Sequence, residues 1–380
     1  MVFVDVNTFY GPKAGGIRTY HQAKLDWFAK QNEHVYCLIH PGPVYKVEQP
    51  APSVYLIQVE SFALTADPQG YRLMWNYFRV AKWIRKLRPE VIEAGDAWLS
   101  SWFLLLLRAI GFWDGLLVSF YHSDPIPSYL IPWSRRGRWR RVRRGIARVG
   151  AALFYSIQRR FDWTVTASRI MEDSLRRQNI LNVKRLPFGV NPAFFLAPVG
   201  LRRDATQPTH LLYAGRLDRD KGIELLLQAL PELLADPSVQ ITVAGRGAFS
   251  DRFASICHER FKFAGFVTDL KSLVELYASH AIFLAPGPHE TFGLAVLEAM
   301  ASGLIVVGPD AGGTGELLSE MNSPFRFAAG DLKDFMDKIR AARAADIEQE
   351  SLRHRELALR YGTWDDAIAR MVSTWRELVR

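Results

Sequence analysis

Two series of short apolar segments run along this chain, and a stretch with helical spacing follows each segment. Strands that alternate with helices in this way predict parallel, doubly wound sheets. The first series comprises residues 2–6, 35–39, 54–59, 91–94, 116–121 and 164–167. The second series comprises residues 211–214, 241–244, 262–264, 282–285 and 305–307. The pattern therefore predicts an α/β protein with two Rossmann-like halves.

The polar, proline-bearing stretch 190–208 separates the two series and is the expected linker. A chain of 380 residues is long enough for two hydrophobic cores. We expect an N-terminal domain at 1–190, completed by 362–380, and a C-terminal domain at 191–361. In sheets of this kind ligands bind outside the carboxyl ends of the strands, which places the expected site in a cleft between the halves.

The segment from His289 to Gly303 holds two carboxylates eight residues apart across a glycine. A loop at 286–288 and a helix at 294–301 would place Glu290 before the helix and Glu298 within it. Free N–H groups at the helix start, near Phe292, Gly293 and Leu294, would suit an anionic leaving group. The alternative is that Glu290 is an N-terminal helix charge and Glu298 an exposed helix residue.

Two cations follow the expected strand at 211–214, Arg216 directly and Lys221 five residues later. Positive groups at the end of a strand suit a diphosphate that must be stabilised as it leaves. Asp218 and Asp220 lie between them, so an ion-paired loop is the alternative. No DxD pair stands where a metal-dependent transferase would need it, the sequence has no HExxH or phosphate-binding GxxxxGK[ST] pattern, and we expect no metal and no cofactor.

These features resemble the E-x7-E motif and the diphosphate-binding segment of retaining glycosyltransferases with the GT-B fold, specifically glycosyltransferase family 4 (group 1). The glycine pair Gly15 and Gly16 resembles the family's N-terminal glycine loop. Segment 188–191 resembles its interdomain linker motif, with two substitutions. Gly245 begins a Gly-x-Gly turn similar to the family's nucleotide turn, and the segment ending at Val267 resembles the segment whose backbone contacts the base.

The resemblance implies two Rossmann-like domains facing a central cleft, with the C-terminal helix at 364–379 crossing back to the N-terminal domain. It also implies a nucleotide diphosphate sugar as donor, linked to UDP or GDP. The implied catalytic residues are His122, Glu290, Arg216 and Lys221. The implied donor-binding residues are Gly15, Gly16, Arg216, Lys221, Gly245, Val267, Glu290, Phe292, Gly293, Leu294 and Glu298. His122 would contact the transferred sugar, or else be a buried structural histidine.

Ten arginines and no acidic residue lie between Pro125 and Phe161. This window carries a formal charge of +10 and the whole chain +9, so the remaining sequence sums to −1. Arginines beside tryptophans suit a contact with anionic lipid, and a solvated helix face or a polyanion is the alternative. No nucleic-acid-binding motif accompanies the charge, so nucleic acid is not expected. The expected membrane-docking residues are Trp133, Arg135, Arg136, Arg138, Trp139, Arg140, Arg141, Arg143 and Arg144.

The only two cysteines, Cys37 and Cys257, have no metal or disulfide-framework spacing, which fits a reducing compartment. The N-terminus begins with a strand-like segment and shows no signal peptide pattern. The apolar run 102–107 is far shorter than the roughly 20 residues that span a bilayer, so we expect a core helix there. The expected location is cytoplasmic and peripheral, on the inner face of the membrane.

Together these expectations describe a retaining, metal-independent hexosyltransferase. Its acceptor would be a membrane lipid or a lipid-linked glycan. The alternatives are a nucleotide-sugar epimerase or a phosphorylase of GT-B fold, or a non-catalytic basic protein that binds membranes.

Overall fold

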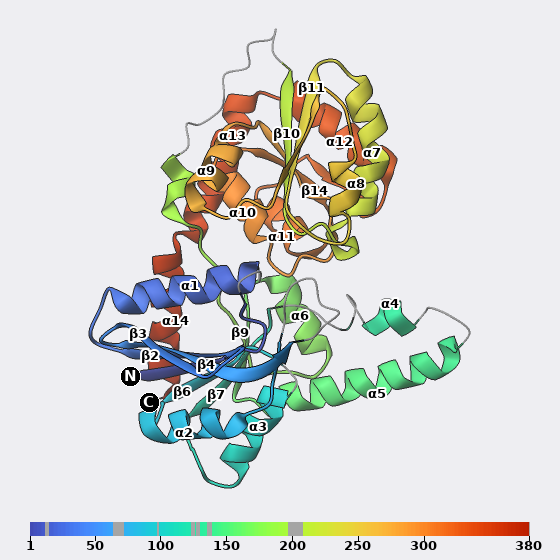
Figure 1. Cartoon of the computed structure of the whole chain (residues 1–380). Helices are drawn as coiled ribbons and strands as arrows, with labels where there is room; N and C mark the ends of the chain where they lie inside the picture. The colour runs from blue at the N-terminus through green and yellow to red at the C-terminus, as the bar shows by residue number, and fades with distance from the viewer. Residues whose placement is uncertain are drawn as a thin grey trace. The chain divides into compact units, whose positions relative to one another are not determined.

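The computed structural model divides the chain into two compact units, Met1–Pro187 with Asp365–Arg380 (unit 1) and Phe188–Trp364 (unit 2) (Figure 1). These boundaries differ by a few residues from the expected ones. The structure describes residues 1–11, 15–63, 72–96, 99–122, 126, 130–134, 139–196 and 208–379, with the side chain of 132 excepted.

Unit 1 is built on a nine-stranded sheet of order β3-β4-β2-β1-β6-β7-β8-β9, in which β5 also pairs with β4. All neighbours are parallel except that β3 and β5 run antiparallel to β4. The strands are β1 (Val2–Val6), β2 (Val35–Gly42), β3 (Lys46–Ala51), β4 (Val54–Ala63), β5 (Arg72–Met74), β6 (Val91–Ala94), β7 (Leu116–Phe120), β8 (Trp163–Thr166) and β9 (Val183–Arg185).

Helices flank this sheet, and the C-terminal helix returns to it (Figure 1). They are α1 (Gly16–Ala29), α2 (Tyr77–Leu87), α3 (Leu99–Ala109), α4 (Ile131–Ser134), α5 (Arg140–Gln158), α6 (Arg169–Arg177) and α14 (Trp364–Val379). Helix α14 buries Ile368, Met371 and Trp375, and the Tyr20 hydroxyl of α1 lies 3.3 Å from the Met371 sulfur. The last helix therefore completes the core of unit 1, as expected.

Unit 2 holds a six-stranded, all-parallel sheet of order β12-β11-β10-β13-β14-β15. Relative to the chain this is the 3-2-1-4-5-6 order of a doubly wound Rossmann fold. Its elements are η2 (Pro192–Leu196), β10 (Thr209–Ala214), η3 (Arg219–Lys221), α7 (Ile223–Ala235), β11 (Val239–Ala244), α8 (Ser250–Ala254), β12 (Phe261–Gly265), α9 (Leu270–Ala278), β13 (Ile282–Leu284), α10 (Leu294–Ala301), β14 (Ile305–Pro309), α11 (Gly312–Glu320), β15 (Arg326–Phe327), α12 (Leu332–Ala344) and α13 (Ile347–Tyr361).

The central strands are buried on both faces, which explains why they read as continuous apolar runs rather than as alternating patterns. In β14 all five residues of Ile305–Pro309 are buried, and in β6 all four of Val91–Ala94 are. Each unit thus has its own core between its sheet and its helices. The order of strands places the carboxyl ends of β10, β11 and β13 beside one another.

The chain passes between the units twice, and the two passes are paired. Val190 forms a parallel bridge with Thr363, and its N–H donates to the Gly362 carbonyl at 3.1 Å. A Cβ at Gly189 would lie 2.0 Å from the Thr363 carbonyl oxygen, so only glycine fits this approach. Within the expected linker, Val190 and η2 thus belong to unit 2, and residues 197–207 lie outside the described residues.

One expectation was partly wrong. The run 102–107 lies in α3, but Trp102 and Leu106 are exposed rather than in the core. The run is apolar all around the helix, so α3 has a buried side with Leu104 and Leu107 and an opposite apolar side that the fold leaves exposed. None of the helices in the described ranges has the length and hydropathy needed to cross a membrane.

Candidate active site

The turn from β13 to α10 places the first carboxylate and the start of the helix. Gly293 adopts φ 93°, a left-handed conformation that favours glycine, and α10 begins at the next residue. Within the described chain no side chain caps this helix, so its first N–H groups are available to an anion. Phe292 is buried, with its ring 5.2 Å from that of Phe188 and 5.7 Å from that of Tyr361. Aromatic packing around Phe292 therefore fixes the position of the turn.

Lys221 and Glu290, from two different loops, form an ion pair with 2.7 Å between Nζ and Oε1. Both side chains are partly buried. The loops approach closely because Gly222 adopts φ 69° and a Cβ there would lie 2.3 Å from the Pro286 carbonyl oxygen. The structure therefore brings together two residues that lie 69 positions apart in the sequence. A ligand bearing phosphate and hydroxyl groups could engage both ends of this pair.

Arg216 is held by the acidic residues of its own loop. Its Nη1 lies 2.6 Å from Asp218 and its Nη2 lies 2.5 Å from Asp220. Asp218 also accepts a hydrogen bond from the Ala248 N–H at 2.9 Å, which joins this loop to the turn after β11. This is the ion-paired alternative raised by the sequence. Arg216 would have to share or exchange these partners to contact a diphosphate.

Glu298 is partly buried on α10 and is not the exposed helix residue of the alternative interpretation. Burial raises its pKa to about 7, and a hydrogen bond from the Tyr277 hydroxyl, at 3.4 Å, partly opposes this rise. A carboxyl group in this state gains from any further hydroxyl donor, because such a donor stabilises its charged form. Ribose or sugar hydroxyls are donors of that kind.

The turns after β11 and β12 complete this edge of the sheet. Gly245 adopts φ 142°, and a Cβ there would lie 1.8 Å from the Gly215 carbonyl oxygen. Its N–H donates to the Gly265 carbonyl at 2.7 Å, which sets the turn that leads to the partly buried Val267. The Arg246 guanidinium lies 4.3 Å from the centre of the exposed Phe266 ring, so the edge also presents a stacked cation and ring.

Thr314, on α11, was not identified from the sequence. It is fully buried, and its hydroxyl has no hydrogen-bond partner within the described part of the chain. This hydroxyl lies 3.5 Å from the point where a Cβ would stand on Gly293. The sequence signal that could have indicated it is the glycine pair Gly312 and Gly313, which begins α11 shortly after β14 and matches the glycines that follow other strands of this sheet.

Unit 1 places His122 two residues after the end of β7, at the carboxyl edge of its sheet. The ring stacks on Phe120, with centroids 4.3 Å apart, and lies 6.1 Å from the ring of His21. Burial, followed by the charges of His21 and Lys24, holds the pKa of His122 well below its usual value. The imidazole is therefore neutral at pH 7, when it can donate or accept a hydrogen bond but carries no charge.

A buried charge cluster lies beneath His122 and was also missed by sequence reasoning. Lys24 Nζ lies 2.6 Å from Asp5 and 3.1 Å from Glu93, and the hydroxyls of Tyr36 and Tyr20 donate to the two carboxylates. Burial opposes ionisation of both acids. Lys24 and His21 nevertheless lower the pKa of Asp5 to about 2, whereas burial and the charge of Asp5 raise that of Glu93 to about 7. The sequence signal that could have indicated this cluster is a carboxylate in each of two otherwise apolar strands, Asp5 in β1 and Glu93 in β6.

The remaining expected residues are placed as follows. Gly16 is the first residue of α1, and Gly15 precedes it, with nothing within 4 Å of a Cβ built on Gly15. Trp139 is exposed at the start of α5, and the Arg143 guanidinium lies 5.3 Å from the centre of the Trp133 ring. Arg135, Arg136 and Arg138 lie outside the described residues.

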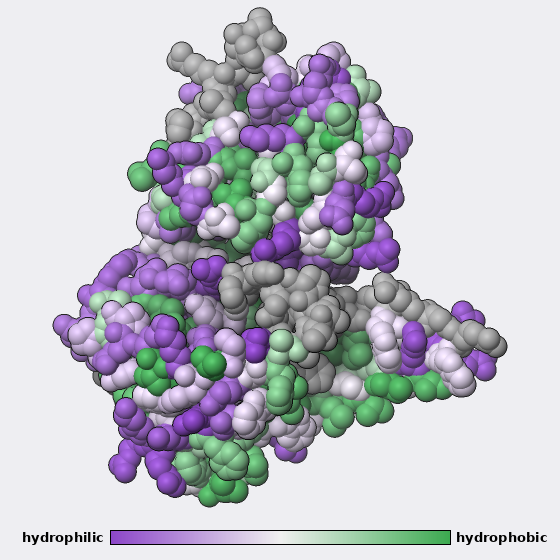
Figure 2. All heavy atoms as spheres, viewed as in Figure 1, coloured by the Kyte–Doolittle hydropathy of each residue, from purple (hydrophilic) through white to green (hydrophobic). Residues whose placement is uncertain are grey.

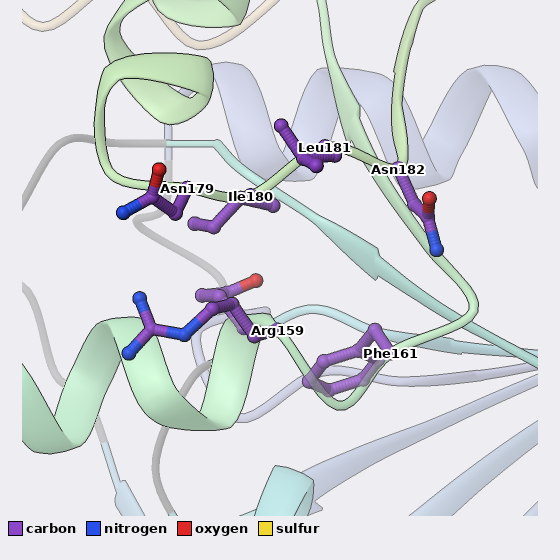
Figure 3. A pocket seen from close by; sticks show the side chains of 7 residues that line it. Arg159, Phe161, Asn179, Ile180, Leu181 and Asn182 are labelled. Atoms are coloured by element: carbon purple, nitrogen blue, oxygen red, sulfur yellow. The ribbon is translucent and has the colours of Figure 1, made fainter.

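A separate pocket lies in unit 1, between the C-terminal end of α5 and the segment that connects α6 to β9. In Figure 3 the side chains of Arg159 and Asn179 lie at one end of this pocket, and those of Phe161 and Asn182 at the other. It contains none of the expected site residues. Within the described ranges, no group of three or more His, Cys, Asp or Glu side chains is arranged to hold a metal ion.

Comparison with known families decides the class of this protein. A profile described as "Glycosyltransferase Family 4" matches residues 14–194, and one described as "Glycosyl transferases group 1" matches residues 208–344. The two matches follow one another along most of the chain. The chain belongs to glycosyltransferase family 4 (group 1). It is therefore an enzyme that transfers glycosyl groups.

Two relatives from Mycobacterium tuberculosis are similar to this glycosyltransferase. One, a "GDP-mannose-dependent alpha-(1-6)-phosphatidylinositol dimannoside mannosyltransferase", is 27% identical over 98% of this chain and 96% of its own length. The other, a "GDP-mannose-dependent alpha-mannosyltransferase", is 31% identical over 67% of this chain and 65% of its own length.

Solved structures share the architecture. Sucrose-phosphate synthase from Thermosynechococcus elongatus has a TM-score of 0.76 at 20% identity and covers 99% of this chain and 98% of its own. Anabaena HepE, solved with UDP, has a TM-score of 0.72 at 14% identity and covers 99% of this chain and 100% of its own. At such identities the likeness shows the fold. The glycosyltransferase thus has the GT-B fold that the sequence predicted.

Proposed function

We propose that this glycosyltransferase moves a hexose from a nucleotide diphosphate sugar to a membrane lipid or a lipid-linked glycan, with retention of the anomeric configuration. The observation that carries the proposal is the Lys221–Glu290 pair beside the uncapped start of α10. This arrangement sets a cation, a carboxylate and free N–H groups side by side. These are the groups needed to hold a sugar and stabilise its departing diphosphate.

In the proposed reaction the bond between the anomeric carbon and the diphosphate oxygen breaks, and a bond to the acceptor oxygen forms on the same face of the sugar. The acceptor proton leaves with the diphosphate. Lys221, Arg216 and the amides at Gly293 and Leu294 stabilise the diphosphate charge as it grows. Binding of the diphosphate frees Arg216 from part of its contact with Asp218 and Asp220. No metal is needed, because these groups supply the positive charge.

The other expected residues take roles in binding. Glu290 is proposed to hold the donor sugar once Lys221 turns to the diphosphate, and Glu298 is proposed to accept hydrogen bonds from the ribose. His122 of unit 1 is proposed to contact the transferred sugar as a neutral imidazole. The backbone at Gly245 and Val267 would contact the base, and Gly15 and Gly16 would allow close approach of the donor or the acceptor.

The choice of donor and acceptor draws on the relatives. GDP-mannose dependence appears in the names of both mycobacterial relatives, so GDP-mannose is the first donor to test. One of them acts on a phosphatidylinositol dimannoside, which supports a lipid acceptor. The arginines of α5 support a peripheral location on the cytoplasmic face of an anionic membrane, where such an acceptor would be present.

The test incubates the purified protein with GDP-mannose, UDP-glucose or UDP-galactose and a phospholipid extract. We expect nucleotide diphosphate release that depends on the extract, together with a glycolipid whose anomeric centre, read by NMR, matches that of the donor. An inverted centre would refute retention. Turnover of the donor sugar without any acceptor would favour an epimerase instead.

A further inference from the structure

Helix α5 exposes a stripe of large apolar side chains. Val142, Ile146, Val149 and Leu153 are each between 54% and 61% exposed. At 100° per residue these four positions fall within an arc of about 60° on one side of the helix. Figure 2 shows this stripe as hydrophobic colouring along the lower edge of α5. The stripe borders the side that packs on the rest of unit 1, which carries Phe154 and Ile157.

The polar side of the same helix is basic. Arg140, Arg141, Arg144 and Arg148 are exposed, and none of them falls within the arc of the apolar stripe. No acidic residue occurs anywhere in the window 125–161. The exposed Trp139 stands at the N-terminal end of the helix. A helix with an exposed apolar stripe, exposed arginines outside that stripe and a tryptophan at its end has the character of a helix that lies in a membrane interface.

A second apolar stripe accompanies the first. Leu99, Trp102 and Leu106 of α3, and Ile110 directly after its end, are exposed at helical spacing. The Arg108 guanidinium of α3 bonds Asp162 at 2.5 Å and the Arg160 carbonyl at 2.7 Å, so this helix lies beside the segment that follows α5. In Figure 2 hydrophobic side chains are visible from the same side over α5 and over the end of unit 1 that holds α3.

We propose that α5 lies in the interface of an anionic membrane, with the Val142–Leu153 stripe at the acyl boundary and its arginines among the headgroups. The inference rests on the membrane location in the proposed function and adds insertion of an apolar face to electrostatic contact. Charge complementarity selects lipid over a second copy of the chain, because pairing two such helices would bring their arginines together without any acidic partner.

Depth of insertion is the direct test. Val149→Cys in a Cys257→Ser background leaves one accessible thiol, since Cys37 is buried. An environment-sensitive fluorophore there is expected to brighten on vesicles of phosphatidylglycerol and phosphatidylcholine and to be quenched by nitroxides on the acyl chains. The control carries the fluorophore at Leu359→Cys, an exposed apolar position on α13 of unit 2, and should show neither effect. An unquenched fluorophore at position 149 would overturn the inference.

The energetic test compares two double variants. Val149→Gln with Leu153→Gln should weaken vesicle partitioning about tenfold, because two large side chains lose their apolar burial. Leu352→Gln with Leu359→Gln, on α13, should partition like the parent. Part of the parent's binding should persist in 1 M salt, where screening removes most exposed electrostatics. Parent-like partitioning of the stripe variant, or a concentration-dependent dimer that this variant abolishes, would refute insertion.

Donor binding separates this inference from the proposed function. The stripe variant should retain the thermal shift of the parent with the nucleotide sugar, because its substitutions belong to unit 1 and the proposed donor loops belong to unit 2. If the parent inserts into vesicles but shows neither a thermal shift with the donor nor sugar transfer, the proposed reaction is refuted and the insertion is supported. If the parent transfers the sugar but a fluorophore at position 149 is not quenched, the insertion is refuted and the reaction is supported.

Discussion

At the scale of the residue, the protonation of Glu298 should make both stability and the proposed donor binding depend on pH. Its pKa of about 7 lies above the ordinary value of 4.5, so the folded protein holds this proton more tightly than the unfolded chain does. The carboxyl group therefore costs stability as the pH rises from 4.5 to above 7. Glu298→Gln should raise the Tm by about 2 °C at pH 8 and by less at pH 5, after allowance for the partial exposure of the side chain.

The same substitution should weaken donor binding, because an amide accepts hydrogen bonds less strongly than a carboxylate. Thermal unfolding at the two pH values, with and without nucleotide sugar, checks both effects. If the gain in Tm over the parent were larger at pH 5 than at pH 8, burial would not be the cause of the raised pKa of Glu298.

Lys24 is the residue on which the buried cluster of unit 1 depends. Removing one partner of a buried ion pair leaves an uncompensated charge, so Lys24→Met should cost about 3 to 5 kcal/mol of unfolding free energy. The loss should be smaller at pH 5.5, where Glu93, with a pKa of about 7, is protonated. Lys30→Met is the matched control, since Lys30 forms an exposed pair with Asp365 and should change little. Equal losses in denaturant titrations of the two variants would contradict this account.

The charged residues of the candidate site could be predicted from the sequence, but the side chains that they contact could not. The sequence indicated Arg216, Lys221 and Glu290 as charged groups at strand ends. Nothing in it showed that Lys221 pairs with Glu290, since that contact depends on the close approach of two loops at Gly222. Thr314 and Lys24 were missed for the same reason. A buried hydroxyl or lysine has no recognisable spacing, and it acquires meaning only from the groups that the fold brings to it.

At the scale of the element, the start of α10 is the testable feature. Gly293→Ala should cost about 1 to 2 kcal/mol, because φ 93° is strained for a residue with a Cβ. It should also lower activity, since the N–H groups that follow would shift. Gly330→Ala is the matched control, with φ 85° and nothing within 4 Å of its Cβ. We expect similar losses of stability from the two variants in denaturant titrations. Loss of turnover should follow Gly293→Ala alone, and equal turnover in both variants would argue against an anion at this helix start.

The central parallel strands could be predicted because most of their positions are buried on both faces and apolar. Among the edge strands, β12 was predicted, but β3, β5, β9 and β15 were not. Strand β3 is mostly exposed, and its polar sequence Lys46–Ala51 gives no burial signal, while β5 has only three residues. Helix α3 shows the opposite limit. An unbroken apolar run indicates burial, yet Trp102 and Leu106 are exposed, because hydropathy alone does not show which side of a helix the fold leaves uncovered.

At the scale of the whole molecule, the proposed reaction assigns the donor to unit 2 and needs no metal. If positive side chains and the start of α10 stabilise the leaving diphosphate, transfer should proceed in excess EDTA at a rate within about twofold of the untreated enzyme. Nucleotide diphosphate release, measured before and after chelation, checks this expectation. Activity that EDTA abolishes and magnesium or manganese restores would show that a metal takes part in the reaction.

The central claim is that the loops of unit 2 stabilise a departing nucleotide diphosphate, and Lys221 tests it most directly. Single-turnover release of the diphosphate should slow by a factor of about 100 to 1,000 in Lys221→Ala, the loss typical of one electrostatic contact in the transition state. Donor affinity should change far less. Lys271→Ala, which removes an exposed cation of α9, should match the parent. A folded Lys221→Ala enzyme that releases diphosphate at the rate of the parent would contradict the account.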